Sequence, residues 1–382
     1  MSFTFATANR IIFGDGTLSQ ARDIIKSYGE RVLIVVGTSS KRADPLLNQL
    51  NDVEIVLFSV ATEPTIPLIE DGVRVAKALD AQVIVGFGGG SVVDAAKAIA
   101  ALAPNEGQAL DYLEVIGKGQ KLENFPLPFI AIPTTAGTGS EVTKNAVLAS
   151  PEHHVKVSLR SAAMLANVAI VDPELTHSVS PSITATTGMD ALTQVIEPFV
   201  SHLANPITDG FCREALKRGG QAIRRVVQNG QDAVARHDMA LVSLLGGLAL
   251  ANAKLGAVHG FAGVIGGMFN APHGGICAAL LPPVMKANIQ ALSERDPENP
   301  ILSRFDDIGK MLTGDSSASA NDGIAWIEET VQLLDIPSLG NYGIAETDFE
   351  AIIAKSRKSS SMKGNPLPLT DAELMAILKA AL

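Results

Sequence analysis

The chain has 382 residues and a formal net charge of −10, and 47% of its residues are hydrophobic whereas 18% are charged. This length is typical of two domains, and this composition is typical of a globular protein with a large core. The negative charge argues against nucleic-acid and anionic-membrane partners, since either would require a basic surface, and it favours small-molecule chemistry.

The first half of the chain alternates short β-branched runs with helical periodicity. Strand-like runs lie at residues 3–6, 10–13, 31–36, 53–58, 82–85, 129–132, 155–159 and 168–171, and residues 18–27 have the pattern of a helix. Such alternation is typical of βαβ units around a parallel sheet. We expect the last three runs either to extend that sheet or to form a ribbon beside it.

The second half has a different pattern. From Pro181 onward the sequence shows helical periodicity, with segments rich in alanine and leucine such as 239–255 and few β runs. We therefore predict an α/β domain with a parallel sheet over residues 1–180, followed by an all-α domain over residues 181–382.

The cysteine content and the N-terminal segment indicate the compartment. Cys212 and Cys277 are the only cysteines and form no CxxC pair, which excludes a disulfide framework and a zinc ribbon. The N-terminal segment lacks a basic stretch followed by a long apolar run, and the later apolar stretches are broken by polar residues. We expect a cytoplasmic protein with no signal peptide and no membrane-spanning helix.

A glycine-rich loop follows the strand that ends at Val85. Its sequence, GFGGGS at 86–91, opens an alanine-rich helix, so it lies where a helix N-terminus points free N–H groups outward. Ser91 and Asp94 resemble a capping box at the start of this helix. An ordinary glycine-rich turn is the alternative, but the loop predicts a phosphate site at Gly88, Gly89, Gly90 and Ser91.

A second loop, PTTAGTGSE at 133–141, follows the strand ending at Ile132. Its hydroxyls can donate to phosphate, ribose or carboxamide without adding charge, and ligands bind at the carboxyl ends of parallel strands. A solvated polar turn is the alternative. We expect a ligand contact from Thr134, Thr135, Thr138 and Ser140.

Two histidines lie in an apolar, glycine-rich stretch of the second half. His259 and His273 are surrounded by glycines, alanines and branched aliphatic residues, where an imidazole without a partner is unfavourable. They could be core histidines bonded to backbone carbonyls, or they could bind a small ligand or an ion.

The motifs in order resemble one family. GFGGGSVVDAAK, PTTAGTGSE, DPELT, GMDALTQVIEPFVS, and VHGFAG with FNAPHGG are similar to those of the iron-containing, or group III, alcohol dehydrogenases. The resemblance covers nearly the whole chain. It implies a dinucleotide-binding α/β domain, a helical domain, an active site in the cleft between them, and NAD(P)-dependent interconversion of alcohols with aldehydes or ketones.

Carried over residue by residue, the resemblance implies two groups of site residues. The dinucleotide would contact the two loops described above, together with Asp94, Lys156 and Leu175. The metal ligands and catalytic residues would be Asp190, His259 and His273.

Two positions depart from the family pattern at the reacting centre. Most members have a histidine four residues after the aspartate, where this chain has Gln194, and many have a further histidine where this chain has Gly263. A carboxylate with two imidazoles suits Fe(II) or Zn(II). Gln194 could add a neutral carbonyl oxygen as a metal ligand weaker than imidazole, so we expect reduced metal affinity.

The loop after the first strand of the sheet indicates the choice of cofactor. NAD-selective members often have an acidic residue there, which contacts the ribose 2′-OH. This chain has a glycine, three hydroxyls and a lysine instead, and these side chains can accommodate a 2′-phosphate. We therefore predict NADP in preference to NAD, although NAD is possible, with contacts from Gly37, Thr38, Ser39, Ser40 and Lys41.

These inferences favour an NAD(P)-dependent alcohol dehydrogenase or aldehyde or ketone reductase. One alternative is a metal-independent reductase of a keto acid, similar to maleylacetate reductases, in which Lys156 or Arg160 holds the acid group. Another is a non-catalytic dinucleotide-binding protein. The apolar segment 241–250 is either a core helix or a subunit interface, and we expect a homo-oligomer.

Overall fold

The computed structural model describes residues 2–153, 155–269 and 271–382, which form two compact units. The α/β unit comprises residues 5–135 and 139–176. The helical unit comprises residues 177–382, and it also includes the segment ending at Thr4 and the segment Ala136–Thr138. A division at one position, such as residue 180, cannot represent these two short segments.

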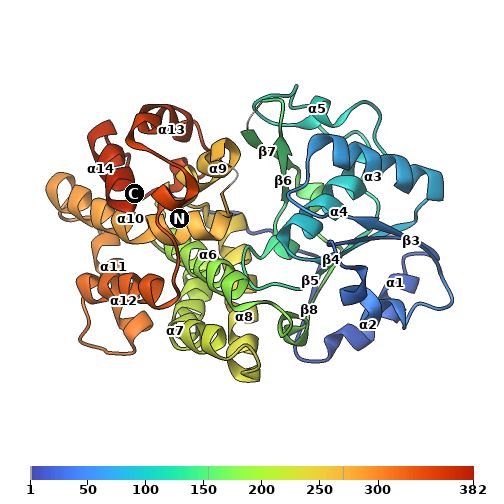
Figure 1. The fold of residues 1–382 in the computed structure, drawn as a ribbon, viewed down its shortest axis with the longest axis horizontal. Coiled ribbons are helices and arrows are strands. Elements are labelled where there is room, and N and C mark those ends of the chain that lie inside the picture. The colour runs from blue at the N-terminus through green and yellow to red at the C-terminus, as the bar shows by residue number, and fades with distance from the viewer. Residues whose placement is uncertain (1, 154, 270) are drawn as a thin grey trace. The chain divides into compact units, whose positions relative to one another are not determined.

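A six-stranded parallel sheet forms the centre of the α/β unit (Figure 1). In chain order its strands are β1 (Arg10–Phe13), β2 (Arg31–Val36), β3 (Glu54–Ser59), β4 (Val83–Gly88), β5 (Phe129–Pro133) and β8 (Val168–Val171). They lie in the order β1-β8-β5-β4-β2-β3, and every pairing is parallel. The predicted parallel sheet is confirmed, and the runs at 129–132 and 168–171 extend it.

Helices cover both faces of this sheet (Figure 1). Helices α1 (Ala21–Lys26) and α2 (Asp44–Leu47) pack on the face that carries Val32, Ile34 and Val36. Helices α3 (Ile66–Leu79) and α4 (Gly90–Leu102) cover the other face, and the short helix α5 is Ala109–Tyr112. The inner strands are therefore buried on both sides, which explains their continuous β-branched sequences.

The order of the strands reverses between β2 and β4. The chain passes from β2 to β3 on one side and then crosses to β4 on the other side of β2. Such a reversal opens a crevice at the carboxyl ends of the strands, where ligands bind in sheets of this type. The loops that begin at Gly37 and Gly89 both start at this point of the sheet.

A two-stranded antiparallel ribbon lies beside the sheet. It consists of β6 (Asn145–Ser150) and β7 (Val155–Arg160), and β6 packs against α4. The run at 155–159 therefore belongs to a ribbon. The strand predicted at 3–6 is wrong, because these residues lie outside the strands.

The helical unit is built from nine helices among the described residues. They are α6 (Pro181–Val200), α7 (Pro206–Gln228), α8 (Ala233–Ala253), α9 (Ala257–Phe269), α10 (His273–Arg295), α11 (Ile301–Thr313), α12 (Ala320–Leu333), α13 (Phe349–Ser356) and α14 (Asp371–Ala381). The predicted all-α second half is confirmed. Side-chain oxygens of Ser180, Asn205, Asp232 and Thr370 accept hydrogen bonds at the N-termini of α6, α7, α8 and α14, which fixes where these helices begin.

Two helices, α8 and α10, are long and apolar enough to cross a membrane by length and composition. Most of each apolar stretch is buried inside the helical unit. Helix α8 packs on α6 and α7, and α10 packs on α6, α9 and α14. Their apolarity is therefore that of core helices.

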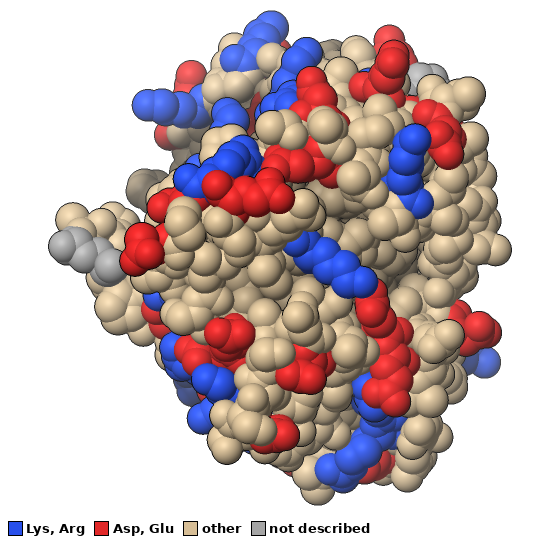
Figure 2. All heavy atoms as spheres, turned by 90° about the vertical axis from the view of Figure 1, so that its left-hand side faces the viewer, with Lys and Arg blue, Asp and Glu red and all other residues tan. Residues whose placement is uncertain are grey.

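Acidic and basic side chains are interspersed over the face drawn in Figure 2. In the helical unit, ion pairs join neighbouring helices, as between Lys286 on α10 and Glu328 on α12 (2.6 Å) and between Arg295 on α10 and Glu373 on α14 (3.0 Å). The net negative charge is therefore not gathered into one block on this face.

Candidate functional site

Three helices of the helical unit bring a carboxylate and two imidazoles together. Asp190 Oδ1 on α6 lies 3.2 Å from Nε2 of His259 on α9 and 3.8 Å from Nε2 of His273 on α10. Asp190 and His259 are buried, whereas the His273 side chain is 32% exposed. Nε2 of each histidine therefore faces a carboxylate rather than a backbone carbonyl.

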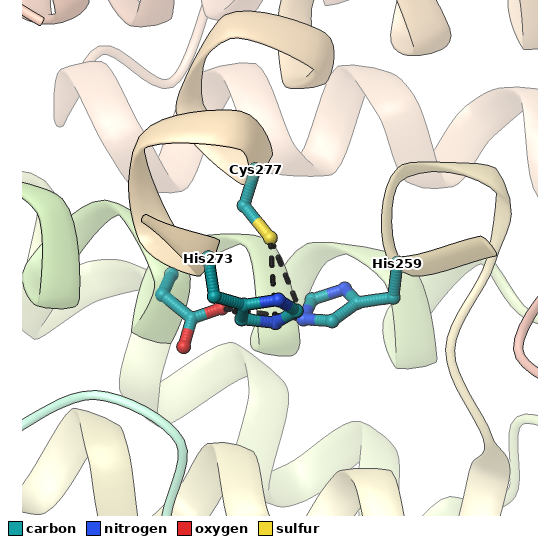
Figure 3. Close-up of side chains that lie close together, drawn as sticks. His259, His273 and Cys277 are labelled. Atoms are coloured by element: carbon teal, nitrogen blue, oxygen red, sulfur yellow. Dashed lines mark hydrogen bonds and ion pairs between the residues drawn. The ribbon is translucent and has the colours of Figure 1, made fainter. Parts of the chain in front are cut away.

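Cys277 joins this group, although it was not among the residues predicted as ligands. Its Sγ lies 3.8 Å from His259 Nε2 and 3.7 Å from His273 Nε2, and Figure 3 shows the sulfur directed toward both rings. The four potential ligand atoms of Asp190, His259, His273 and Cys277 all lie within 4.8 Å of one another. The spacing of His273 and Cys277, four residues apart on one helix, was the signal that could have found it.

Glu197 contacts the second ring nitrogen of His259, Nδ1. Its Oε2 is 2.6 Å from His259 Nδ1, and its Oε1 accepts from the backbone N–H of Val258 at 2.7 Å. A neutral His259 that donates from Nδ1 to this carboxylate presents the lone pair of Nε2 to the cluster. Carboxylates bonded to a metal-binding histidine commonly fix the ring in this way. Glu197 was not among the residues predicted from the sequence.

The charges of the cluster shift its pKa values in a consistent direction. Burial alone would raise the pKa of Asp190, but the hydrogen bond from His259 and the charges of the two imidazoles lower it below its usual value. Burial alone would lower the pKa of each histidine, but Cys277 and Asp190 raise both, and Glu197 further raises that of His259. The acidic surroundings therefore favour a cation at this point, either a proton or a metal ion.

Gln194 lies one helical turn after Asp190. Its Nε2 donates to the carbonyl of Gly137 at 3.2 Å, and its buried Oε1 has no hydrogen-bond partner among the described residues. Thr138 Oγ1 donates to Asp190 Oδ2 at 3.5 Å. These two contacts attach Ala136–Thr138 to the helical unit, and they bring Thr138 beside the predicted metal ligand. A buried acceptor without a partner is unfavourable unless an ion or a water satisfies it.

The donors of the cluster fit a divalent ion. Imidazole nitrogen, carboxylate oxygen and thiolate sulfur are the ligands of zinc sites, and the unsatisfied oxygen of Gln194 is a further neutral donor. At Gly263, where the family resemblance implies a histidine, an added Cβ would meet nothing within 4 Å.

In the α/β unit, the glycine-rich turn joins a strand directly to the N-terminus of a helix. Strand β4 ends at Gly88, Gly89 is the N-cap, and α4 begins at Gly90. A Cβ at Gly88 would lie 2.6 Å from Val92, so only glycine permits this approach of strand to helix. The turn directs the first-turn N–H groups of a thirteen-residue helix to the carboxyl edge of the sheet.

The hydroxyl loop lies beside this turn. The backbone N–H of Thr134 donates to the carbonyl of Gly88 at 2.9 Å, and a Cβ at Gly89 would lie 3.4 Å from Thr135 Oγ1. Ser140, by contrast, donates to Asp94 and accepts from Lys97 at 3.2 Å. The two predicted loops are therefore neighbours, although Ser140 is engaged within the unit.

The capping box predicted for Ser91 and Asp94 is wrong. The N-cap is Gly89, and Asp94 turns away to accept hydrogen bonds from Ser140 Oγ and from the N–H of Val147 at 3.0 Å. Burial raises the pKa of Asp94, although Lys97 and these donors lower it in part. The carboxylate of Asp94 therefore forms hydrogen bonds with residues distant in sequence, and not with the helix N-terminus as the local sequence predicted.

The remaining residues predicted to contact the cofactor are Lys156, Leu175 and the loop that begins at Gly37. Lys156 Nζ pairs with Glu63 at 2.9 Å, and Leu175, in the turn Pro173–Thr176, packs partly buried against the core of the sheet. A Cβ at Gly37 would lie 4.0 Å from Val92 in the first turn of α4. The loop 38–42 that follows Gly37 is exposed.

Comparison with known proteins identifies the relatives of this chain. The family described as "Iron-containing alcohol dehydrogenase" matches residues 8–173, and "Fe-containing alcohol dehydrogenase family, C-terminal" matches residues 184–382. Alcohol dehydrogenase 4 of Schizosaccharomyces pombe is 36% identical over 380 residues, covering 97% of this chain and 87% of that protein. The 1,3-propanediol dehydrogenase of Klebsiella pneumoniae is 34% identical over 390 residues, covering 99% and 98%.

A solved structure agrees with these sequence relatives. The crystal structure of a 1,3-propanediol oxidoreductase superposes with a TM-score of 0.92 at 33% identity, and it covers 100% of both chains. The protein is therefore an oxidoreductase that acts on CH–OH groups. With both halves matched in order along nearly the whole sequence, the chain belongs to the iron-containing alcohol dehydrogenase family.

Proposed function

We propose that the protein interconverts small alcohols with their aldehydes or ketones, using a nicotinamide dinucleotide and one divalent metal ion held by Asp190, His259 and His273. The observation that carries this proposal is the meeting of these three side chains from three helices, with Nε2 of both histidines near one carboxylate oxygen. The choice of small alcohols is supported by the relatives named for alcohol and 1,3-propanediol.

The residues of this chain would divide the work. A bound ion would polarise the oxygen of the substrate carbonyl, which favours hydride transfer at the adjacent carbon. With a metal bound, Glu197 would accept the proton of His259 at Nδ1, so that Nε2 would be available as a ligand. Gln194 and Cys277 are both candidates for a fourth donor. Whether Fe(II) or Zn(II) is preferred depends on which of them binds.

The activity test uses the whole protein stripped of metal and reloaded with Fe(II) or Zn(II). NAD(P)H oxidation is followed with a panel of aldehydes, ketones and keto acids. We expect reduction of small aldehydes that disappears in the stripped protein and returns on reloading. Reduction of keto acids without metal would instead support the metal-independent alternative, and dinucleotide binding without turnover would support a non-catalytic protein.

In the metal-independent alternative, both candidate cations for a substrate acid already have a carboxylate neighbour. Lys156 Nζ lies 2.9 Å from Glu63, and Arg160 lies 3.7 Å from Glu114. Each therefore already has a carboxylate within ion-pair distance, and a substrate acid would have to compete with it.

We further propose that NADP(H) is preferred over NAD(H). The proposal is supported by Gly37 at the carboxyl end of β2, close to the first turn of α4, and by the hydroxyls and the lysine that follow it without an acid. A charge-assisted hydrogen bond to the 2′-phosphate contributes roughly 1.5 to 3 kcal/mol, or about 10- to 100-fold in affinity.

The test is the ratio of kcat/KM for the two cofactors. Gly37→Asp should reverse the preference, because the new carboxylate repels the 2′-phosphate and accepts from a ribose 2′-OH. Gly210→Asp is the matched control, since an added Cβ there meets nothing within 4 Å and the residue lies on α7 of the helical unit. A wild-type ratio that favours NADH would contradict the proposal.

The predicted homo-oligomer stays a prediction. The apolar segment that suggested an interface lies in α8, where Val242, Leu244 and Leu248 are buried within the chain itself. Light scattering at micromolar concentration measures the assembly directly, and a monomeric mass would contradict the prediction.

A further inference from the structure

We propose that Cys277 supplies the fourth protein ligand of the metal, so that the donor set is one carboxylate, two imidazoles and one thiolate, with a fifth position for the substrate oxygen, and that the site therefore prefers Zn(II) to Fe(II). This inference rests on the metal site of the proposed function. It replaces the neutral oxygen of Gln194, which the sequence alone suggested, with a charged sulfur from another helix.

Four of the six separations between the ligand atoms are close to those of a tetrahedron around one ion. With bonds of about 2.0 Å to N and O and about 2.3 Å to S, a tetrahedral zinc site holds N and O about 3.3 Å apart and S and N about 3.5 Å apart. Here the two N–O separations are 3.2 and 3.8 Å, and the two S–N separations are 3.8 and 3.7 Å. These four separations lie within about 0.5 Å of the corresponding edges, and the N–N and S–O separations are at most 4.8 Å.

The helix places the sulfur where a ligand is required. His273 and Cys277 are four residues apart on α10, so their side chains share one face, and the sulfur is directed toward both imidazoles (Figure 3). Cys277 is fully buried, and its sulfur has ring nitrogens of the cluster as its neighbours. A buried thiolate is unfavourable unless a cation compensates its charge, and a metal ion at the centre of the cluster would do so.

The chemistry of the donors distinguishes Cys277 from Gln194. A thiolate is a soft, charged ligand that favours zinc, whereas an amide oxygen is neutral and hard. The Nε2 of Gln194 donates to the carbonyl of Gly137 and leaves its Oε1 without a partner, so the softness and charge of the sulfur, and not the hydrogen bonding of the amide, distinguish the two donors.

The experiment uses the full-length protein, stripped of metal and reloaded with one equivalent of Co(II), which reports a sulfur ligand by a thiolate-to-metal charge-transfer band in the near ultraviolet. We expect the band in the wild type, in Gln194→Ala and in Cys212→Ser. We expect it to be absent in Cys277→Ser, whose zinc affinity should fall at least about 10-fold, since even loss of an outer-shell partner costs that much.

Cys212→Ser is the matched control because Cys212 is the only other cysteine, is also fully buried, and lies on α7. A second measurement covers the case in which Cys277→Ser does not fold. Wild-type protein loaded with cadmium-113 should give one NMR resonance shifted downfield, as a sulfur-containing donor set requires. The wild type alone therefore tests the inference.

The outcomes separate this inference from the proposed function. Bound Co(II) without the charge-transfer band, a band that persists in Cys277→Ser, or a cadmium resonance typical of nitrogen and oxygen ligands alone would overturn the role of Cys277 and leave the metal site intact. Failure of the wild type to bind any of the three metals would overturn the proposed metal site itself.

Discussion

Replacing Glu197 by glutamine is the most informative change near the predicted metal site, because it keeps the shape of the side chain, removes its charge and replaces one acceptor oxygen by an N–H donor. The carboxylate accepts from His259 Nδ1 at 2.6 Å and from the N–H of Val258 at 2.7 Å. A glutamine can accept through one of these positions only. If its oxygen stays with Val258, its amide faces Nδ1 and favours a proton on Nε2, the atom that must bind the metal.

The expected loss follows from this geometry. In the opposite orientation, the amide N–H of the glutamine would face the N–H of Val258, and two donors would oppose each other. Either orientation therefore loses one hydrogen bond to a charged group. Such a bond contributes about 1.5 to 3 kcal/mol. That range corresponds to about 10- to 100-fold weaker metal binding, which is also the usual effect of losing a carboxylate behind a metal-binding histidine.

Zinc affinity can be measured by competition with a chromophoric chelator at fixed pH, with nitrogen-15 NMR of the histidines to report the tautomer. Glu214→Gln, on the exposed part of α7, is a matched control, since its carboxylate pairs only with Arg218 in the described contacts. Unchanged zinc affinity in Glu197→Gln, with the protein folded, would refute the reasoning.

Two further predictions concern stability. Burial raises the pKa of Glu141 from 4.5 to about 7. Because the folded-state pKa exceeds the unfolded value, the contribution of Glu141 to the free energy of unfolding is fully present below pH 4.5 and is lost as the pH rises through 7. The loss amounts to up to about 3 kcal/mol. Glu141→Gln should therefore flatten the fall in unfolding free energy between pH 5 and pH 8, as measured by urea denaturation, and an unchanged slope would contradict this. Gly274→Ala should destabilise the protein by about 1 to 3 kcal/mol, since its Cβ would lie 2.2 Å from the carbonyl oxygen of Thr186. Thermal unfolding beside the control Gly210→Ala measures the effect, and equal melting temperatures would show that α10 can shift without loss.

The fold was largely predictable because its signals are local. Buried parallel strands require continuous β-branched runs, as at 31–36 and 129–132, and helices require a longer period, so the change of pattern near residue 180 indicated the change of architecture. The strand predicted at 3–6 was wrong because an alternating pattern is only compatible with a strand. A strand also requires a neighbouring strand with which its backbone forms hydrogen bonds.

The details of the site were less predictable because their partners are distant in sequence. The sequence predicted Asp94 as part of a capping box, but its oxygens accept hydrogen bonds from Ser140 and Val147. These residues are 46 and 53 positions away. Cys277 looked like an isolated cysteine until α9 and α10 brought it to His259, 18 residues away. Glu197 and His259 are 62 residues apart, and no local pattern connects them.

The membership of Ala136–Thr138 in the helical unit has a consequence for any attempt to treat the two halves as exchangeable modules. The hydrogen bonds from Gln194 to Gly137 and from Thr138 to Asp190 are internal to that unit, although more than forty residues separate this segment from residue 181. A fragment beginning at 181 would leave Gln194 and Asp190 without these partners. A chimaera that joins the first half of one relative to the second half of another would bring a foreign sequence to this point. Recombination between relatives should therefore preserve function best when this loop and α6 are inherited together.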